Sequence, residues 1–278
     1  MNKLLFIGGC PRSGTTLVKR LLNSHDDIYC GPEFGNLEAI LNIYNTMKKG
    51  IENERLKEYL QLEDLKLYYY DFIYKLLSKP TKNTKITYLA EKTPSNIKVF
   101  THLHEIFPEA VLLHVIRNPF DVVTSILNVG KRSSNLPEHY YDVRKAAIFW
   151  RQTVNWITRF ETSKTLEFQQ QYKILKYEDL LHEPRMVVED LLNWLDVKVD
   201  FNIINLSEKE GQPNSFGNIF YTSDEYYKNF DTNNINKYKN SLSEQEKKIV
   251  LEETKNELIK FGYMSSSEIN ICTTNKNF

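Results

Sequence analysis

KLLFIGGCPRSGTTLVKRLL, residues 3–22, joins a short apolar run to an amphipathic one through a loop that has a glycine near each end. Lys3–Gly8 is typical of a buried strand, whereas Leu17, Leu21 and Leu22 have the spacing of an apolar helix face. A strand, a loop and a helix in this order form the opening unit of a parallel α/β sheet. We therefore expect the first strand to lie inside such a sheet.

The loop of this unit nearly matches a phosphate-binding sequence. Gly9 and Gly14 are separated by four residues, as in the motif G-x-x-x-x-G-K-[ST], and Thr16 keeps its hydroxyl position. Thr15 replaces the lysine that reaches a γ-phosphate. The N–H groups at the start of the helix can still bind an anion, and Arg12 adds a positive charge. The loop indicates a phosphate site, although a glycine turn at this place can also be purely structural.

Further strands alternate with helices along the chain. Apolar runs predict strands at Ile86–Ala90, Val111–Ile116 and Tyr172–Leu175. Asn118-Pro119 predicts a helix start after the second of these, because Asn suits the N-cap and Pro the first helical position. Val143–Phe160 has the pattern of a long amphipathic helix. The predicted fold class is therefore α/β, a P-loop-type parallel sheet flanked by helices.

The length of the chain favours one domain. We expect a single domain over residues 1–264 and a polar, flexible tail over 265–278, since 278 residues suit one large α/β core. Helical periodicity in 36–85 predicts a helical cap inserted after the first strand and helix. Tyr68–Tyr70 of this cap either stack on a ligand or belong to the core. The core is favoured, because the apolar face continues through Phe72–Leu77.

Composition excludes several classes of partner. The 36 basic and 36 acidic side chains give a formal net charge of zero, so no global electrostatic attraction to nucleic acid or an anionic membrane is expected. Three widely spaced cysteines suggest neither a disulfide framework nor a metal site. The longest apolar run, Ala110–Ile116, is far shorter than the roughly 20 residues of a transmembrane helix. These features predict a soluble, cytoplasmic protein without a metal or a transmembrane segment.

A second anion-binding pattern follows the strand at 111–116. The segment RNPFDVVTS, residues 117–125, places Arg117 at the carboxyl end of that strand and Ser125 two turns into the next helix. A guanidinium and a hydroxyl so placed converge on one phosphate, at the edge where parallel sheets bind ligands. Arg117 could instead form a surface salt bridge. Asp121 either faces the same ligand or is a helix-start carboxylate, and the second interpretation is favoured.

PRSGTTL, residues 11–17, and RNPFDVVTS together resemble two binding segments of the sulfotransferases that use 3′-phosphoadenosine-5′-phosphosulfate (PAPS). The similarity is greatest to the tyrosylprotein sulfotransferases and related bacterial enzymes. In that family the first segment binds the 5′-phosphosulfate and the second the 3′-phosphate. The resemblance implies PAPS as sulfonate donor and adenosine 3′,5′-bisphosphate as product, without a metal. It assigns donor binding to Pro11, Arg12, Ser13, Gly14, Thr15, Thr16, Arg117, Ser125 and Tyr177.

Three more segments match that family, and a later loop carries a serine that its members often have. Tyr177-Glu178-Asp179-Leu180 resembles a segment whose tyrosine holds the nucleotide, and Glu91-Lys92-Thr93-Pro94 one whose lysine faces the donor. Cys30-Gly31-Pro32-Glu33 matches the segment whose glutamate is the catalytic base. Pro213-Asn214-Ser215-Phe216 carries a serine in a late loop, where the family places a donor hydroxyl. The resemblance thus implies catalytic roles for Glu33, Lys92, Arg12 and Ser215, although a loop glutamate or a surface lysine can also be unspecialised.

The implied reaction is in-line transfer of a sulfonate group to an acceptor hydroxyl with a carboxylate as general base. The acceptor is a saccharide, a lipid, a small alcohol or phenol, or a peptide tyrosine. Two other functions remain open: a P-loop small-molecule kinase and a catalytically inactive nucleotide-binding scaffold. Thr15 argues against the kinase, which needs the loop lysine and Mg²⁺ on a γ-phosphate. Glu33 and Lys92 argue against the scaffold.

Overall fold

The computed structural model describes residues 2–81, 85–156, 166–206 and 230–274. Within these ranges five parallel strands form one sheet in the order β2-β3-β1-β4-β5. The strands are β1 Lys3–Gly9, β2 Ile28–Cys30, β3 Tyr88–Lys92, β4 Val111–Ile116 and β5 Tyr172–Lys176. The predicted α/β class and parallel sheet are confirmed.

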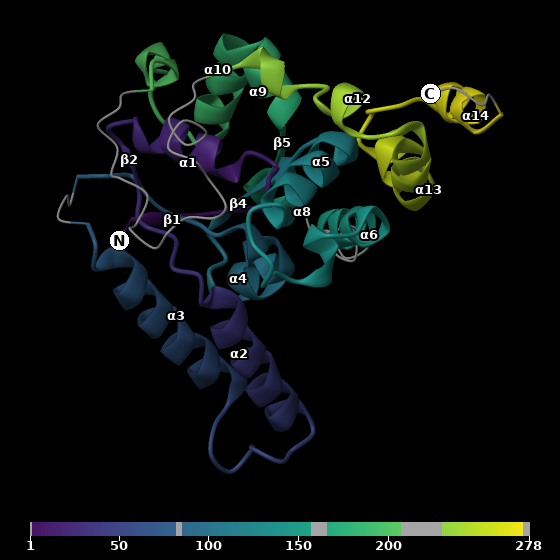
Figure 1. The fold of residues 1–278 in the computed structure, drawn as a ribbon. Helices are drawn as coiled ribbons and strands as arrows, with labels where there is room; N and C mark the ends of the chain where they lie inside the picture. Colours follow the sequence, from purple (N-terminus) through teal and green to yellow (C-terminus); the bar gives the residue numbers. More distant parts are fainter. Residues whose placement is uncertain (1, 82–84, 157–165, 207–229, 275–278) are drawn as a thin grey trace.

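Helices cover both faces of this sheet (Figure 1). The α-helices are α1 Thr15–Asn23, α2 Leu37–Glu52, α3 Leu62–Ser78, α4 Phe100–Ile106, α5 Pro119–Gly130, α6 Val143–Asn155, α8 Leu166–Gln171, α9 Tyr177–His182, α10 Pro184–Trp194, α12 Tyr238–Ser241, α13 Glu244–Lys260 and α14 Ser266–Thr274. Short 3₁₀ turns occur at η1 Pro94–Lys98, η2 Glu138–Tyr140, η3 Phe201–Ile204 and η4 Thr232–Asn234.

The central strand β1 explains how the layers form. Its successive side chains alternate between the faces of the sheet, as in any strand. Leu4 and Phe6 pack into a core with α2, α3 and α4, whereas Leu5 and Ile7 pack into another with α1, α9 and α10. A third core joins α5, α6 and α13 beside the carboxyl end of β4. Burial on both faces accounts for the continuous apolar runs of β1 and β4 in the sequence.

Most predicted strands are confirmed, with one shift. The strand predicted at Ile86–Ala90 lies at Tyr88–Lys92, because Glu91 and Lys92 pair with Phe6 and Ile7 of β1. Both charged residues therefore belong to the strand and not to the loop after it. The strand β2 was not predicted.

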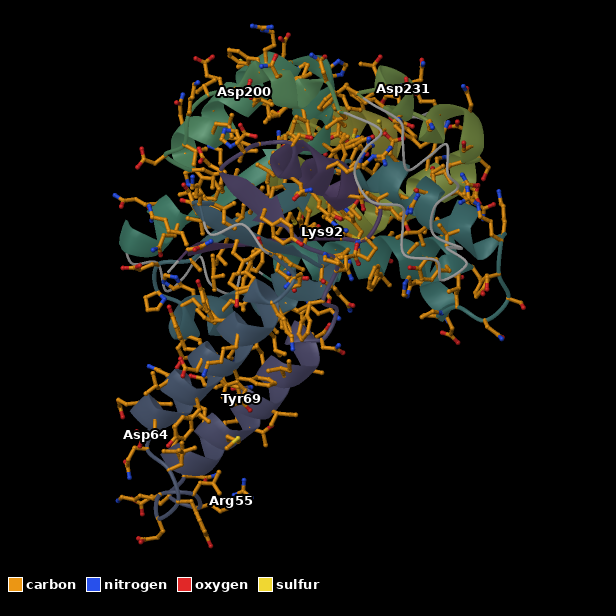
Figure 2. All side chains as sticks on the ribbon, turned by 90° about the vertical axis from the view of Figure 1, so that its left-hand side faces the viewer. Arg55, Asp64, Tyr69, Lys92, Asp200 and Asp231 are labelled. Atoms are coloured by element: carbon orange, nitrogen blue, oxygen red, sulfur yellow. The ribbon has the colours of Figure 1, made fainter. Side chains whose placement is uncertain are left out.

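The helices predicted in residues 36–85 form a hairpin of α2 and α3 that projects from the body of the molecule (Figure 1). Its tip near Arg55 lies far from Lys92 at the sheet edge, as Figure 2 shows. The hairpin therefore does not lie over that edge along its length. Tyr69 and Tyr70 are partly buried, but Tyr68 is 59% exposed, so the prediction of a core role holds for only part of the tyrosine run.

Two predictions near the ends of helices differ from the structure. The helix expected over Val143–Phe160 ends at Asn155 within the described residues. Ser266–Thr274, expected in a flexible polar tail, form helix α14, and Ile269 is buried against the third core. The helix begins with a pair of reciprocal hydrogen bonds. The Ser265 N–H donates to Glu268 Oε2 at 2.7 Å, and the Glu268 N–H donates to Ser265 Oγ at 3.2 Å.

Candidate active site

The carboxyl ends of the five strands carry the predicted site residues in a row. In sheet order these are Glu33 after β2, Lys92 at the end of β3, Arg12 after β1, Arg117 after β4 and Tyr177 after β5. The carboxyl edge of a parallel sheet is where ligands bind in open α/β folds. The topology therefore brings together residues that are widely separated in the sequence.

The loop between β1 and α1 has the backbone of an anion-binding turn. Arg12 and Gly14 adopt left-handed conformations, with φ of 74° and 95°, and the Ser13 N–H donates to the Cys10 carbonyl oxygen at 3.0 Å. Left-handed residues in a turn direct successive N–H groups into one concavity. Helix α1 begins at Thr15, so its first N–H groups add to this concavity.

Gly14 is required here for a second reason. A side chain at this position would collide with the ring of Tyr177, which packs directly on the loop. The ring also faces the Arg117 guanidinium, 4.5 Å from its centroid. Tyr177 therefore links the loop after β1 to the segment after β4.

Three predicted phosphate ligands meet between these two segments. The Arg12 Nε donates to Ser125 Oγ at 2.9 Å, and Arg117 Nη1 donates to the Arg12 carbonyl oxygen at 3.2 Å. The side chain of Arg12 therefore reaches the predicted 3′-phosphate segment. Helix α5 begins as predicted, since the Asn118 side chain accepts from the Phe120 N–H at 3.0 Å.

Lys92 lies between Glu33 and Arg12 in this row. Its side chain is 1% exposed, and its Nζ donates to Thr16 Oγ1 at 3.2 Å and to Glu33 Oε1. The side chain of Glu33 is 48% exposed. The lysine missing from loop position 15 is thus replaced by one that reaches the loop from the neighbouring strand.

The Sulfotransferase family model matches residues 5–201 of this chain, which include Arg12, Glu33, Lys92, Arg117 and Tyr177. The chain belongs to the sulfotransferase family. It is 25% identical over 245 residues to protein-tyrosine sulfotransferase A of Caenorhabditis elegans, covering 87% of this chain and 63% of that protein. It is 27% identical over 211 residues to protein-tyrosine sulfotransferase 1 of Danio rerio, covering 75% of this chain and 57% of that protein.

A solved structure supports the same family fold. The sulfotransferase domain from the curacin biosynthetic pathway superimposes with a TM-score of 0.60 at 17% identity, covering 91% of this chain and 97% of that domain. The chain spans less than two thirds of the length of the two curated relatives above. The described helices include none that is long and apolar enough to cross a membrane.

The candidate site has buried polar atoms that fit an anionic ligand. Ser13 Oγ and Arg117 Nε are buried without a hydrogen-bond partner within the described residues. Both lie in the two segments predicted to bind phosphate, where polar groups of this kind are expected to have partners. The donor set therefore fits a nucleotide with phosphates at two positions. Ser215, predicted as a further catalytic donor, lies outside the described residues.

The sequence did not predict the contacts that Arg117 and Asp121 make with a late segment, residues 234–238. Arg117 Nη2 donates to the Asn234 carbonyl oxygen at 2.5 Å. Asp121 holds the same late segment, accepting from the N–H groups of Asn236 at 2.8 Å and Tyr238 at 3.1 Å. Asp121 does lie in the first turn of α5, as predicted, but its carboxylate anchors a distant loop.

Glu178 supports the segment after β4. Its Oε1 accepts from the Asn118 N–H at 2.9 Å and its Oε2 from the Tyr263 hydroxyl at 3.0 Å. Burial raises the pKa of Glu178, although the hydrogen bond from Asn118 opposes this. The turn after Arg117 is thus tied to the C-terminal part of the chain.

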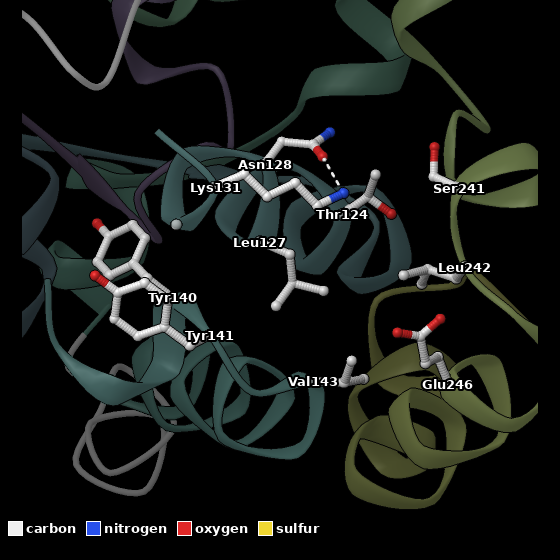
Figure 3. A pocket seen from close by; sticks show the side chains of 11 residues that line it. Thr124, Leu127, Asn128, Lys131, Tyr140, Tyr141, Val143, Ser241, Leu242 and Glu246 are labelled. Carbon is white, nitrogen blue, oxygen red and sulfur yellow. Dashed lines mark hydrogen bonds between the residues drawn. The ribbon is translucent and has the colours of Figure 1, made fainter. Parts of the chain in front are cut away.

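A separate pocket of about 290 Å³ lies beside α5 (Figure 3). It does not include the predicted site residues among its described lining. Polar groups from α5, η2 and α13 surround it, and Lys131 Nζ donates to Asn128 Oδ1 at 3.3 Å. The side chains drawn around it are those of Thr124, Leu127, Asn128, Lys131, Tyr140, Tyr141, Val143, Ser241, Leu242 and Glu246.

Proposed function

We propose that this protein is a PAPS-dependent sulfotransferase that transfers a sulfonate group to an acceptor hydroxyl. One observation carries the proposal: a lysine-free phosphate loop lies between Arg117 with Ser125 on one side and Lys92 with Glu33 on the other. A donor with a 3′-phosphate and a 5′-phosphosulfate needs anion ligands at both places. An NTP kinase needs a lysine at position 15 of the loop instead.

Residues that follow β1, β4 and β5 would hold the donor. Pro11–Thr16 provide N–H groups and hydroxyls for the 5′ end, and Arg117 with Ser125 provide charged and neutral hydrogen bonds for the 3′-phosphate. Tyr177 packs against both segments. When bound, PAPS supplies an activated sulfonate whose leaving group is a phosphate.

Glu33 after β2 and Lys92 at the end of β3 would carry out the transfer. A new bond forms between the acceptor oxygen and sulfur while the bond from sulfur to the phosphate oxygen breaks, and that oxygen keeps the electron pair. Glu33 accepts the proton from the acceptor hydroxyl. Lys92 stabilises the charge that develops on the departing oxygen, because its ammonium already reaches the hydroxyl of Thr16 in the loop.

The proposed acceptor is a molecule that carries a hydroxyl group. The protein-tyrosine sulfotransferases among the relatives support a tyrosine hydroxyl as one candidate. A saccharide, a lipid or a small alcohol has the same reacting group and belongs in the same acceptor panel.

Thermal shift measurements test the donor assignment. Adenosine 3′,5′-bisphosphate should raise the melting temperature by mass action, and ATP with Mg²⁺ should raise it much less. Equal stabilisation by ATP would favour the kinase. Transfer of ³⁵S from labelled PAPS to an acceptor panel and to fractionated cell extract tests the activity. Binding of the bisphosphate without transfer to any acceptor would favour the inactive scaffold.

A further inference from the structure

Glu91 is a charged residue of the site that the reaction above does not use. It precedes Lys92 at the end of β3 and is only 3% exposed. Because neighbouring residues of a strand point to opposite faces, Glu91 faces away from the side to which Lys92 points. Its carboxylate therefore does not share the contacts that Lys92 makes with the phosphate loop.

The contacts of Glu91 lead instead to the loop that carries Glu33. Glu91 Oε1 accepts from the Phe34 N–H at 3.0 Å and from Thr93 Oγ1 at 2.6 Å. Thr93 Oγ1 in turn accepts from the Gly35 N–H at 3.2 Å. The two peptide groups that follow Glu33 are thus both held by the end of β3.

The same carboxylate is tied to the strand before the phosphate loop. Asn96 Nδ2 donates to Glu91 Oε2 and, at 3.2 Å, to the Ile7 carbonyl oxygen. Gly8 lies close against the same turn, since a side chain there would approach the Ile97 nitrogen at 2.5 Å. Glu91 and Asn96 therefore connect the loop of Glu33 to β1.

A carboxylate is well suited to this position. Burial raises the pKa of Glu91, and hydrogen bonds from Thr93, Asn96 and Phe34 oppose that shift. All three partners donate, so a carboxylate, which only accepts, satisfies each of them. A glutamine of the same shape would turn an NH₂ group toward at least one of these donors.

We propose that Glu91 is a positioning residue that holds the peptide after Glu33 so that the Glu33 carboxylate meets Lys92. The inference rests on the proposed role of Glu33 as general base. A displacement of about 1 Å in a catalytic group can lower a rate on the order of 100-fold. Loss of the Glu91 contact should therefore weaken proton transfer without weakening donor binding.

The variants Glu33→Gln, Glu91→Gln and the double variant test this in the full chain. The readouts are single-turnover transfer to an aliphatic or sugar hydroxyl and the affinity for adenosine 3′,5′-bisphosphate. We expect Glu91→Gln to slow transfer roughly 10- to 100-fold and to leave the affinity within about threefold. The double variant should be no slower than Glu33→Gln alone, because residues that act as a unit are not additive.

An acceptor comparison separates positioning from loss of structure. A phenol that is already ionised at the assay pH needs no base. Glu91→Gln should therefore change the rate of transfer to this phenol less than about threefold, which is roughly the agreement expected for mutations at independent sites. An equal loss with both acceptors, or additive effects in the double variant, would overturn the proposal. A wild-type rate in Glu33→Gln would instead overturn the base assignment itself, and the role of Glu91 with it.

Thr93 provides a second test if Glu91→Gln does not fold. Thr93→Val removes the hydroxyl between Glu91 and Gly35, and Thr93→Ser keeps it. We expect the valine variant to show the same acceptor-dependent loss and faster exchange of the Gly35 amide hydrogen, and the serine variant to restore both. Equal behaviour of the two variants would contradict a positioning role for this network.

Discussion

Replacement of Arg117 by alanine should reduce affinity only for ligands that carry a 3′-phosphate. Arg117 is 8% exposed and lies against the ring of Tyr177, so its charge is poorly screened by water. Two of its N–H groups donate to the carbonyl oxygens of Arg12 and Asn234. Its Nε is buried without a partner within the described residues, which leaves this group for a ligand.

The size of the expected loss of affinity follows from these contacts. A hydrogen bond to a charged group contributes about 1.5–3 kcal/mol, which corresponds to roughly a 10- to 150-fold change in affinity. Removing Arg117 also deprives two backbone carbonyls of a donor, but this cost is the same with and without the 3′-phosphate. The comparison of two ligands therefore isolates the contact between arginine and phosphate.

The assay is calorimetric titration of wild type and Arg117→Ala with adenosine 3′,5′-bisphosphate and with adenosine 5′-phosphate. The affinity ratio of the two ligands should fall roughly 10- to 150-fold in the variant, while affinity for the monophosphate changes little. Arg117→Lys keeps the charge without the planar donor group and should lie between the two. An unchanged ratio in Arg117→Ala would refute the assignment of RNPFDVVTS to the 3′-phosphate.

Three further outcomes are expected. Glu33→Gln should lower turnover roughly 10²- to 10⁴-fold at saturating donor, with bisphosphate affinity retained, as single-turnover rates and titration would show. Gly14→Ala should lower the free energy of unfolding by about 1–2 kcal/mol from the left-handed backbone alone, and more where the ring of Tyr177 must move, as measured by urea denaturation. Partial burial works against ionisation of Glu105, but Lys48 at 2.7 Å lowers its pKa below the usual value. Glu105→Gln should therefore cost roughly 0.5–1 kcal/mol at neutral pH, and the difference should disappear as pH falls through the pKa of the folded state, as denaturation at a series of pH values would reveal.

The strands were predictable where burial on both faces leaves a continuous apolar run. β4 was predicted with its observed bounds, and with it the place of Arg117 at the sheet edge. β3 was misplaced because Glu91 and Lys92 have the composition of a loop, and only pairing with β1 extends the strand through them. β2 has three residues, too few to show any period.

The site was predictable to the extent that it rests on local motifs. The loop and Arg117 each follow a strand and Lys92 ends one, and parallel topology brings such positions together. The supporting contacts were not predictable, because they join residues far apart in the chain. Asp121 binds the N–H of Asn236, and no spacing in the sequence indicates that pair. The same holds for Glu91, whose partner Phe34 lies on another strand connection.

The strand order also separates the donor-binding groups from the catalytic groups of the proposed reaction. Groups for the 3′-phosphate lie at β4 and β5, the phosphate loop lies at β1, and Lys92 and Glu33 lie at β3 and β2. A donor that spans this edge would present its sulfonate toward Lys92, so an acceptor hydroxyl within reach of Glu33 must arrive from the β2 side. Helix α2 begins at Leu37, shortly after Glu33, and it leads into the projecting hairpin. The projecting hairpin therefore starts where the acceptor would bind, whereas the donor would be held by the residues that follow β1, β4 and β5.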